Sequence, residues 1–307
     1  MNAPTCAQAL AAAQTLGLDR LDAQLLLLHA LGKPGDARAW LLAHDTDVLP
    51  EQAAQDFRAM CLRRLAGEPL AYIIGKKEFF GLALQVDARV LVPRPDTETL
   101  VEWALARLRA PGAPAAPAVL DLGTGSGAIA LAIAHNLQAD GPQGKVAAVD
   151  ASADALEVAR GNATRLGLQL DFIESHWLEK VGGHFHLIVS NPPYIASTDH
   201  HLEALAYEPL AALAAGADGL DDIREIVLQA SGHLLPGGWL LLEHGYDQAE
   251  AVCALLTQAG FDQVQSRLDL AGIARCSGGF GLAGEPATRD AKRRDNRAVE
   301  FCLPDSI

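Results

Sequence analysis

The sequence predicts an α/β protein in which a helical bundle precedes a mainly parallel sheet. From Ala118 onward, short apolar runs alternate with stretches of helical length, an order typical of a parallel sheet with helices on both faces. Before residue 75, apolar residues recur at helical spacing instead. The 307 residues, 50% of them hydrophobic, are enough for two globular units.

Residues 1–75 are expected to form the helical bundle. Thr5 and Asp19 are predicted helix N-caps. Gly17 and Gly32 are predicted helix stops. One apolar helix face is predicted from the spacing of Leu21, Leu25, Leu28 and Leu31. Because no catalytic pattern occurs here, we expect the bundle to serve in substrate recognition.

Residues 76–95 are expected to form a hairpin linker between the two units. The helical period breaks in this region, and residues 71–75 and 79–86 look extended, with glycines as punctuation. The stretch 96–98 then predicts the start of a helix that runs to about Leu108.

The α/β unit is expected over residues 96–280. Strands are predicted at 119–122, 146–150, 170–174, 185–190, 239–243 and 264–270. Helices are predicted at 128–137, 153–166, 223–235 and 248–259. Residues 281–307 drop this pattern, and we expect a flexible, solvated tail, with an added edge strand at 299–303 as the alternative.

Composition argues against several classes of function. A net charge of −14 is unlike the basic face of a large nucleic-acid-binding surface. The five cysteines are scattered without a CxxC pair, so neither a disulfide framework nor a zinc site is predicted. Neither a signal peptide nor an apolar run of about 18 residues occurs. We expect a cytoplasmic monomer without nucleic-acid or membrane partners.

A glycine-rich loop follows the first strand of the α/β unit. It comprises Gly123, Thr124, Gly125, Ser126 and Gly127. Glycines permit a tight turn and close approach of a ligand to the backbone, and the following helix offers free N–H groups. The spacing differs from G-x-G-x-x-G, which argues against a dinucleotide-binding loop. A purely structural turn is the other alternative.

Asp150 ends the second strand of the unit, 23 residues after Gly127. A carboxylate at this place can accept hydrogen bonds from both hydroxyls of a ribose. The alternative is an N-cap for the next helix. The two roles compete for the same oxygens, and we favour the ribose.

The segment Asn191-Pro192-Pro193-Tyr194 follows a buried strand and is a more specific signal. Two prolines make a stiff turn that presents carbonyls and no N–H. A flat NH₂ group can then donate its hydrogens to the Asn191 side-chain oxygen and the Pro192 carbonyl, which turns its lone pair toward an electrophile. Tyr194 can stack on the target group. An ordinary turn is the alternative.

Together these segments resemble class I S-adenosylmethionine-dependent methyltransferases that act on planar nitrogens. More closely, the chain is similar to the protein-(glutamine-N5) methyltransferases that modify peptide chain release factors. The matching segments are residues 67–70, 92–98, 121–130, 190–195, 208–210 and 241–245. The resemblance implies a Rossmann-like, mainly parallel seven-stranded sheet and methylation of the glutamine in a Gly-Gly-Gln loop.

The resemblance also implies roles for single residues. Gly123 to Gly127 would contact the methionine part of S-adenosylmethionine, and Asp150 its ribose. Trp177 would flank the adenine, with a core aromatic as the alternative. Asn191 would touch both cofactor and substrate, and the glutamine amide would be held by Pro192, Pro193 and Tyr194. The entrance would be lined by Arg94, Thr97 and Glu98, for which a helix cap with an ion pair is the alternative.

Several rival functions follow from the same patterns. The Asn-Pro-Pro-Tyr turn also suits the amine of a flipped adenine in DNA, or the glutamine of a ribosomal protein. A nucleotide-linked oxidoreductase or a silent binding module would share the glycine loop. His184, His186, His200 and His201 lack partners at metal-site spacing, so we expect no metal. Ser126 has no His/Asp partners by motif, which argues against a hydrolase.

Overall fold

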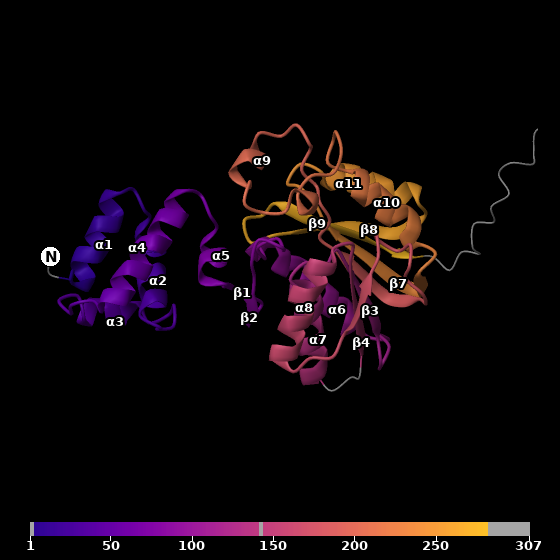
Figure 1. Cartoon of the computed structure of the whole chain (residues 1–307). Coiled ribbons are helices and arrows are strands. Elements are labelled where there is room, and N and C mark those ends of the chain that lie inside the picture. Colours follow the sequence, from indigo (N-terminus) through magenta and orange to yellow (C-terminus); the bar gives the residue numbers. More distant parts are fainter. Residues whose placement is uncertain (1–2, 141–143, 282–307) are drawn as a thin grey trace, which may run out of the picture.

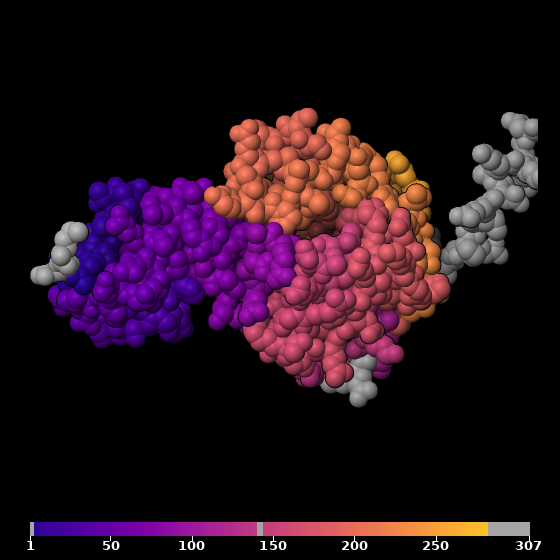
Figure 2. Space-filling model, in the orientation of Figure 1, coloured from indigo at the N-terminus to yellow at the C-terminus, as the bar shows by residue number. Residues whose placement is uncertain are grey.

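The computed structural model describes residues 3–140 and 144–281. Five helices occupy the first part of the chain: α1 (Cys6–Thr15), α2 (Arg20–Ala30), α3 (Arg38–Ala43), α4 (Glu51–Leu65) and α5 (Leu70–Ile74). Helices α1–α4 form a lobe that lies beside the sheet-containing lobe, and the two are joined through α5 and a short hairpin (Figures 1 and 2).

The predicted helix caps are confirmed. Thr5 and Gln8 form a capping box, in which each side chain accepts a hydrogen bond from the backbone N–H of the other. The Asp19 carboxylate accepts from the backbone N–H of Leu21 at 2.7 Å. Gly17 and Gly32 stop their helices with positive φ angles of 94° and 65°.

The predicted apolar face of α2 is confirmed only in part: Leu28 is fully buried and Leu31 packs against the core of the bundle. Leu21 is 44% exposed, whereas Ala23, Leu26 and Leu27 are fully buried in the core of the bundle. Four consecutive leucines fit two overlapping helical faces, so spacing alone did not locate the buried face fully.

The prediction of an extended segment at 71–75 is wrong. Residues 70–74 form one helical turn, α5, which begins after Pro69 and ends at Gly75 in the left-handed conformation. This turn connects the two lobes, because Ile73 packs into the bundle core and Tyr72 packs against the hairpin and α8. The Tyr72 hydroxyl also donates to the Val90 carbonyl at 2.5 Å.

The hairpin and the sheet carry the remaining strands. The antiparallel hairpin consists of β1 (Lys76–Phe79) and β2 (Leu82–Gln85). The sheet consists of β3 (Ala118–Leu122), β4 (Lys145–Asp150), β5 (Asp171–Glu174), β6 (Phe185–Ser190), β7 (Leu234–Glu243), β8 (Phe261–Leu268) and β9 (Ala274–Gly281). Its strand order is β5-β4-β3-β6-β7-β9-β8, and β9 runs opposite in direction to the other six strands. The predicted α/β class with a mainly parallel seven-stranded sheet is confirmed.

Helices cover both faces of this sheet (Figure 1). The longer ones are α6 (Glu98–Leu108), α7 (Ala128–Asp140), α8 (Ala153–Leu166), α10 (Asp221–Ala230) and α11 (Ala249–Gln258); the short ones are η1 (Pro95–Thr97), α9 (His201–Ala204) and η2 (Leu210–Ala212). Alternate strand residues enter opposite cores. In β6, for example, Leu187 and Val189 pack with α6 and α7, and Ile188 packs with α10 and α11.

Three boundaries at the C-terminal side differ from expectation. The helix predicted at 223–235 ends at Ala230, because β7 already begins at Leu234. The late strand lies over Phe261–Leu268 rather than 264–270, and β9 was missed. Gly278 explains the omission: a Cβ there would lie 2.6 Å from the Leu240 carbonyl oxygen, so close packing excludes the apolar side chains that mark a strand. The expected tail beyond residue 281 and its alternative strand at 299–303 lie outside the described residues.

After β3 the chain adds β4 and β5 on one side of that strand and then returns to add β6 on its other side. β3 and β6 are parallel neighbours, with Leu122 opposite Ser190 at their carboxyl ends. In open α/β sheets, ligands bind in the crevice at such a reversal of strand order. The glycine loop and the Asn-Pro-Pro-Tyr turn are therefore brought together here. Among the described residues, no helix has the length and apolar character needed to cross a bilayer.

Candidate active site

The glycine loop forms a tight turn between β3 and α7. Gly123, Gly125 and Gly127 have positive φ angles of 67°, 54° and 83°, a backbone region that favours glycine. The Thr124 N–H donates to the Val149 carbonyl at 2.9 Å, which ties the loop to the end of β4. The loop thus approaches the crevice with backbone rather than side chains.

Asp150 accepts hydrogen bonds through both carboxylate oxygens. Oδ2 accepts from the Gly125 N–H at 2.9 Å and Oδ1 from the Ser152 N–H at 2.9 Å. The N-cap of α8 is Ser152, whose hydroxyl accepts from the Ala155 N–H at 3.2 Å, so the N-cap interpretation of Asp150 is wrong. Burial raises the Asp150 pKa, and the backbone N–H groups oppose that rise. A carboxylate has about four lone-pair positions, so the group can still accept from a further donor.

Trp177 packs over the glycine loop. A Cβ added to Gly123 would lie 3.3 Å from the indole ring. The indole N–H donates to Asp222 Oδ1 at 3.2 Å, and the backbone of Trp177 has a φ of 41°, a conformation that costs free energy in a non-glycine residue. Only 8% of Trp177 is exposed, so it is both a core aromatic and a wall of the crevice.

A cavity of about 450 Å³ lies at this end of the sheet. Its lining includes the predicted site residues Gly123, Asp150, Trp177, Asn191 and Pro193. Sequence reasoning missed the other lining residues, which are Arg89, Leu91, Ala151, Ser152, Ala155, Ser175, His176, Pro209, Ala211, Ala212 and Asp222. The volume lies within the usual range for small-molecule sites, about 300–1,000 Å³.

The Asn-Pro-Pro-Tyr turn is fixed from several sides. The Ser190 hydroxyl before it donates to the Leu122 carbonyl at 2.8 Å. The Gln248 amide donates to the Tyr194 carbonyl at 3.0 Å. A Cβ on Gly219 would lie 2.2 Å from that same carbonyl oxygen, so glycine is required there. These contacts make the turn a rigid part of the site rather than an ordinary surface turn.

Inside the turn, the prolines are buried and Tyr194 is half-buried. Pro192 and Tyr194 are not among the residues that line the cavity. Burial raises the Tyr194 pKa, so the phenol is neutral at physiological pH.

The three residues expected at the entrance make different contacts. Arg94 forms an ion pair with Glu208, whose Oε2 also accepts from the Val92 N–H at 3.0 Å. Glu98 accepts from the Phe80 N–H at 3.0 Å and so holds the hairpin. None caps a helix through its side chain, so that alternative is wrong, while the ion pair is present at Arg94.

Thr97 is buried and faces the Asn-Pro-Pro-Tyr turn. Its hydroxyl accepts from the Asn191 side-chain NH₂ at 3.3 Å. Glu243, at the end of β7, is 1% exposed and lies against both side chains. Burial raises its pKa to about 7. Glu243 was not predicted as a site residue, because its neighbours here come from elements distant in the sequence.

Asp121 is a second buried carboxyl group at the crevice. Its Oδ2 accepts from the Thr124 hydroxyl at 2.7 Å and the Ala130 N–H at 3.2 Å. Its Oδ1 has no protein partner within the described part of the chain. Burial raises the Asp121 pKa to about 7.

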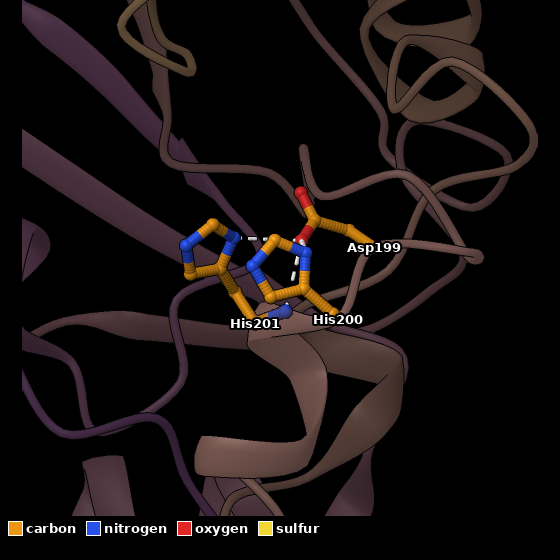
Figure 3. Close-up of side chains that lie close together, drawn as sticks. All are labelled: Asp199, His200 and His201. Carbon is orange, nitrogen blue, oxygen red and sulfur yellow. Dashed lines mark hydrogen bonds and ion pairs between the residues drawn. The ribbon is translucent and has the colours of Figure 1, made fainter.

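Within the part of the chain that the structure describes, two groups of side chains lie close enough to share a cation. Figure 3 shows Asp199, His200 and His201; the other group is His176, Glu179 and Glu225. Asp199 Oδ1 already accepts from the His201 backbone N–H at 2.8 Å and lies 2.7 Å from its ring Nδ1. These contacts account for the Asp199 arrangement without an ion, and the absence of a metal stays a prediction.

Comparisons with known proteins place these features in context. Residues 5–75 match the family model for the PrmC N-terminal domain, and residues 104–217 match that for the methyltransferase small domain. The chain is 51% identical over 268 residues to the release factor glutamine methyltransferase of Bordetella pertussis, covering 86% of this chain and 96% of that protein. A protein of the same name from Burkholderia pseudomallei is 48% identical over 272 residues, covering 85% of this chain and 92% of that protein.

Proposed function

The chain belongs to the family of release factor glutamine methyltransferases, and from this premise we propose which residues of the crevice hold cofactor and substrate. We further propose that the substrate is the glutamine of the Gly-Gly-Gln motif in a peptide chain release factor, methylated on its side-chain amide nitrogen. The observation that carries this assignment is the junction of the glycine loop and the Asn-Pro-Pro-Tyr turn at neighbouring strand ends.

The crevice fits S-adenosylmethionine. The cofactor supplies an electrophilic methyl group on a sulfonium. Asp150, which accepts from backbone N–H groups without using all of its lone pairs, would accept from the ribose. Trp177, packed over Gly123, would flank the adenine. The glycine loop, Gly123 to Gly127, would hold the methionine part.

The substrate amide would be held by the Asn-Pro-Pro-Tyr turn. The Asn191 side-chain oxygen and the Pro192 carbonyl would each accept one amide hydrogen, and Tyr194 with Pro193 would pack against the flat amide. This grip turns the nitrogen lone pair out of conjugation. Catalysis then comes from positioning and from hydrogen bonds that strengthen as the nitrogen gains charge. No base is needed, because a methylated amide cation is very acidic.

The bundle has a separate role in this proposal. Residues 1–75 would grip the rest of the release factor, residues 76–95 would link them to the methyltransferase domain at 96–280, and the protein would act as a cytoplasmic monomer without nucleic acid. Contacts between the lobes support a fixed placement of the bundle: the Tyr207 hydroxyl donates to the Ala66 carbonyl at 3.2 Å.

The test is incubation of the protein with methyl-labelled S-adenosylmethionine and a purified release factor, followed by mass mapping. The proposal predicts one methyl group on the glutamine side chain of the Gly-Gly-Gln motif. Parallel reactions with duplex DNA and with ribosomal proteins should stay unlabelled. Label on adenine or on a ribosomal protein alone would overturn the substrate assignment, and NAD binding in place of S-adenosylmethionine would overturn the cofactor.

A further inference from the structure

The side chain of Glu243 ends in an unusual place for a carboxyl group. β7 pairs with β6 so that Leu242 lies opposite Ser190, which sets Glu243 beside Asn191. Glu243 is 1% exposed, and its Oε2 has no hydrogen-bond partner among the described residues at usual distances. A buried carboxyl group with an unsatisfied oxygen lowers stability, so a functional reason for it is worth testing.

The contacts of Asn191 suggest that reason. An asparagine side chain has one accepting oxygen and one donating NH₂ group, and only the oxygen can accept from a substrate amide. The NH₂ group donates to Thr97 Oγ1 at 3.3 Å. It also lowers the pKa of the nearby Glu243 carboxyl group. With the NH₂ group held there, the oxygen faces the other way.

Thr97 determines which groups donate and which accept in this arrangement. Its hydroxyl has one hydrogen, and it accepts from Asn191. That hydrogen is therefore available to the neighbouring Glu243 carboxyl group, whose pKa Thr97 lowers as a donor. A carboxylate only accepts, so an ionised Glu243 beside these two groups favours Thr97 and the Asn191 NH₂ group as donors.

We propose that Glu243 and Thr97 are positioning residues, which hold the Asn191 amide with its oxygen toward the glutamine amide of the substrate. The inference rests on the proposed function, because it assigns a purpose to the orientation of Asn191. Neither residue need touch the substrate or the cofactor.

Protonation of Glu243 would disturb this order. Burial raises its pKa to about 7, while Thr97, Arg275 and Asn191 favour the carboxylate and Asp96 disfavours it. Tyr194 and Cys276 also face Glu243, and both are neutral because burial raises their pKa values. A protonated Glu243 can donate to Thr97 and so release the Asn191 amide to turn over. Activity should therefore fall as the pH drops below about 7.

The experiment compares Thr97→Val with Thr97→Ser, because valine removes the hydroxyl at nearly constant volume and serine retains it. We expect Thr97→Val to lower kcat by roughly 10- to 100-fold, and Thr97→Ser to stay within about threefold of wild type. Binding of S-adenosylmethionine by calorimetry should be unchanged in both variants, which excludes general damage to the fold.

Glu243→Gln supplies the second arm. An amide keeps one acceptor but adds a donor, so we expect a lower kcat and no fall in kcat/KM between about pH 8 and pH 6, where wild type falls. A wild-type rate and pH profile in both Thr97→Val and Glu243→Gln would overturn the positioning roles alone. If wild type transfers no methyl group to the release factor glutamine, the proposed function and this inference fail together.

Discussion

Asn191 is the residue on which the proposed chemistry depends most. It lies at the carboxyl end of β6, its NH₂ group is held by Thr97, and it lines the cavity together with Gly123. Asn191→Ala removes the oxygen that would accept a hydrogen bond from the substrate amide as its nitrogen gains positive charge. We therefore expect kcat, measured by transfer of labelled methyl, to fall by about 100-fold or more.

Asn136→Ala is the matched control. Asn136 lies on α7, and its NH₂ group donates to the Ala132 carbonyl of the same helix, away from the crevice. The control should methylate at the wild-type rate. An Asn191→Ala enzyme as active as the control would remove the amide-holding role.

Asp150 is tested by affinity rather than by rate. If both of its oxygens accept from a ribose, Asp150→Ala should weaken S-adenosylmethionine binding roughly tenfold or more, since hydrogen bonds to a charged group contribute about 1.5–3 kcal/mol each. Asp154→Ala, an exposed substitution on α8, serves as the control in calorimetry. Equal affinities for the two variants would leave Asp150 with only its backbone contacts to the glycine loop.

At this scale, local sequence revealed some site residues and hid others. Asp150 and Asn191 were found because each follows a readable strand, Trp177 was found only through the family resemblance, and all three line one cavity. Glu243 and Gln248 were missed, because their contacts with the turn depend on the pairing of β6 with β7 and on loops that approach from elsewhere. Spacing in one sequence does not encode such pairings.

Among the elements, most α/β boundaries could be predicted from apolar runs, and the failures have physical causes. α8 begins at Ala153 and ends at Leu166, as predicted from the alternation of strand and helix patterns; in the structure its N-cap is Ser152 and its C-cap is Gly167. α5 was misread as a strand, because a single helical turn is too short to show its period. β9 was missed, because two adjacent glycines stand where its neighbours pack closest.

α8 also connects the glycine loop to the hairpin. Asn162 is fully buried, donates to the carbonyls of Gln85 and Ser126 at 2.9 Å, and accepts from the Gln85 N–H at 2.7 Å. Asn162→Ala leaves these groups without a partner. We therefore expect the free energy of unfolding, measured in urea, to fall by about 2–4 kcal/mol.

The control for this element lies on the same helix. Thr164→Ala removes an exposed hydroxyl that bonds only within α8, and its effect should stay within about 0.5 kcal/mol. If Asn162→Ala were as stable as Thr164→Ala, the hydrogen bonds that connect helix, hairpin and glycine loop would not contribute to the stability of the fold.

For the whole molecule, the buried carboxyl groups link stability to pH. Burial raises the Glu243 pKa from its ordinary value of 4.5 to about 7, so the folded state binds a proton that the unfolded state releases. Its stabilising contribution is complete below about pH 4 and is lost as the pH rises through about 7. Glu243→Gln should therefore be more stable than wild type at pH 8, and this difference should exceed that at pH 5 by on the order of 2–3 kcal/mol.

Melting temperatures at the two pH values measure this effect. Glu102→Gln, an exposed change on α6, should leave the difference between pH 5 and pH 8 unaltered. A Glu243→Gln protein whose stability tracks wild type at both pH values would mean that Glu243 is not protonated by burial.

The two lobes meet near the crevice, where α5 packs on the hairpin and Tyr207 reaches the end of the bundle. This arrangement leaves a protein substrate two surfaces to contact, the bundle and the mouth of the cavity (Figure 2). We expect the substrate loop to enter the crevice while the bundle contacts the rest of the same protein.

The most direct measurement is a crystal structure of the protein with a non-reactive S-adenosylmethionine analogue and a peptide that contains Gly-Gly-Gln. The account predicts the glutamine nitrogen within hydrogen-bond distance of both Asn191 Oδ1 and the Pro192 carbonyl, with the analogue between Gly123 and Trp177. A glutamine side chain bound elsewhere, or an Asn191 that turns its NH₂ group toward the peptide, would contradict it.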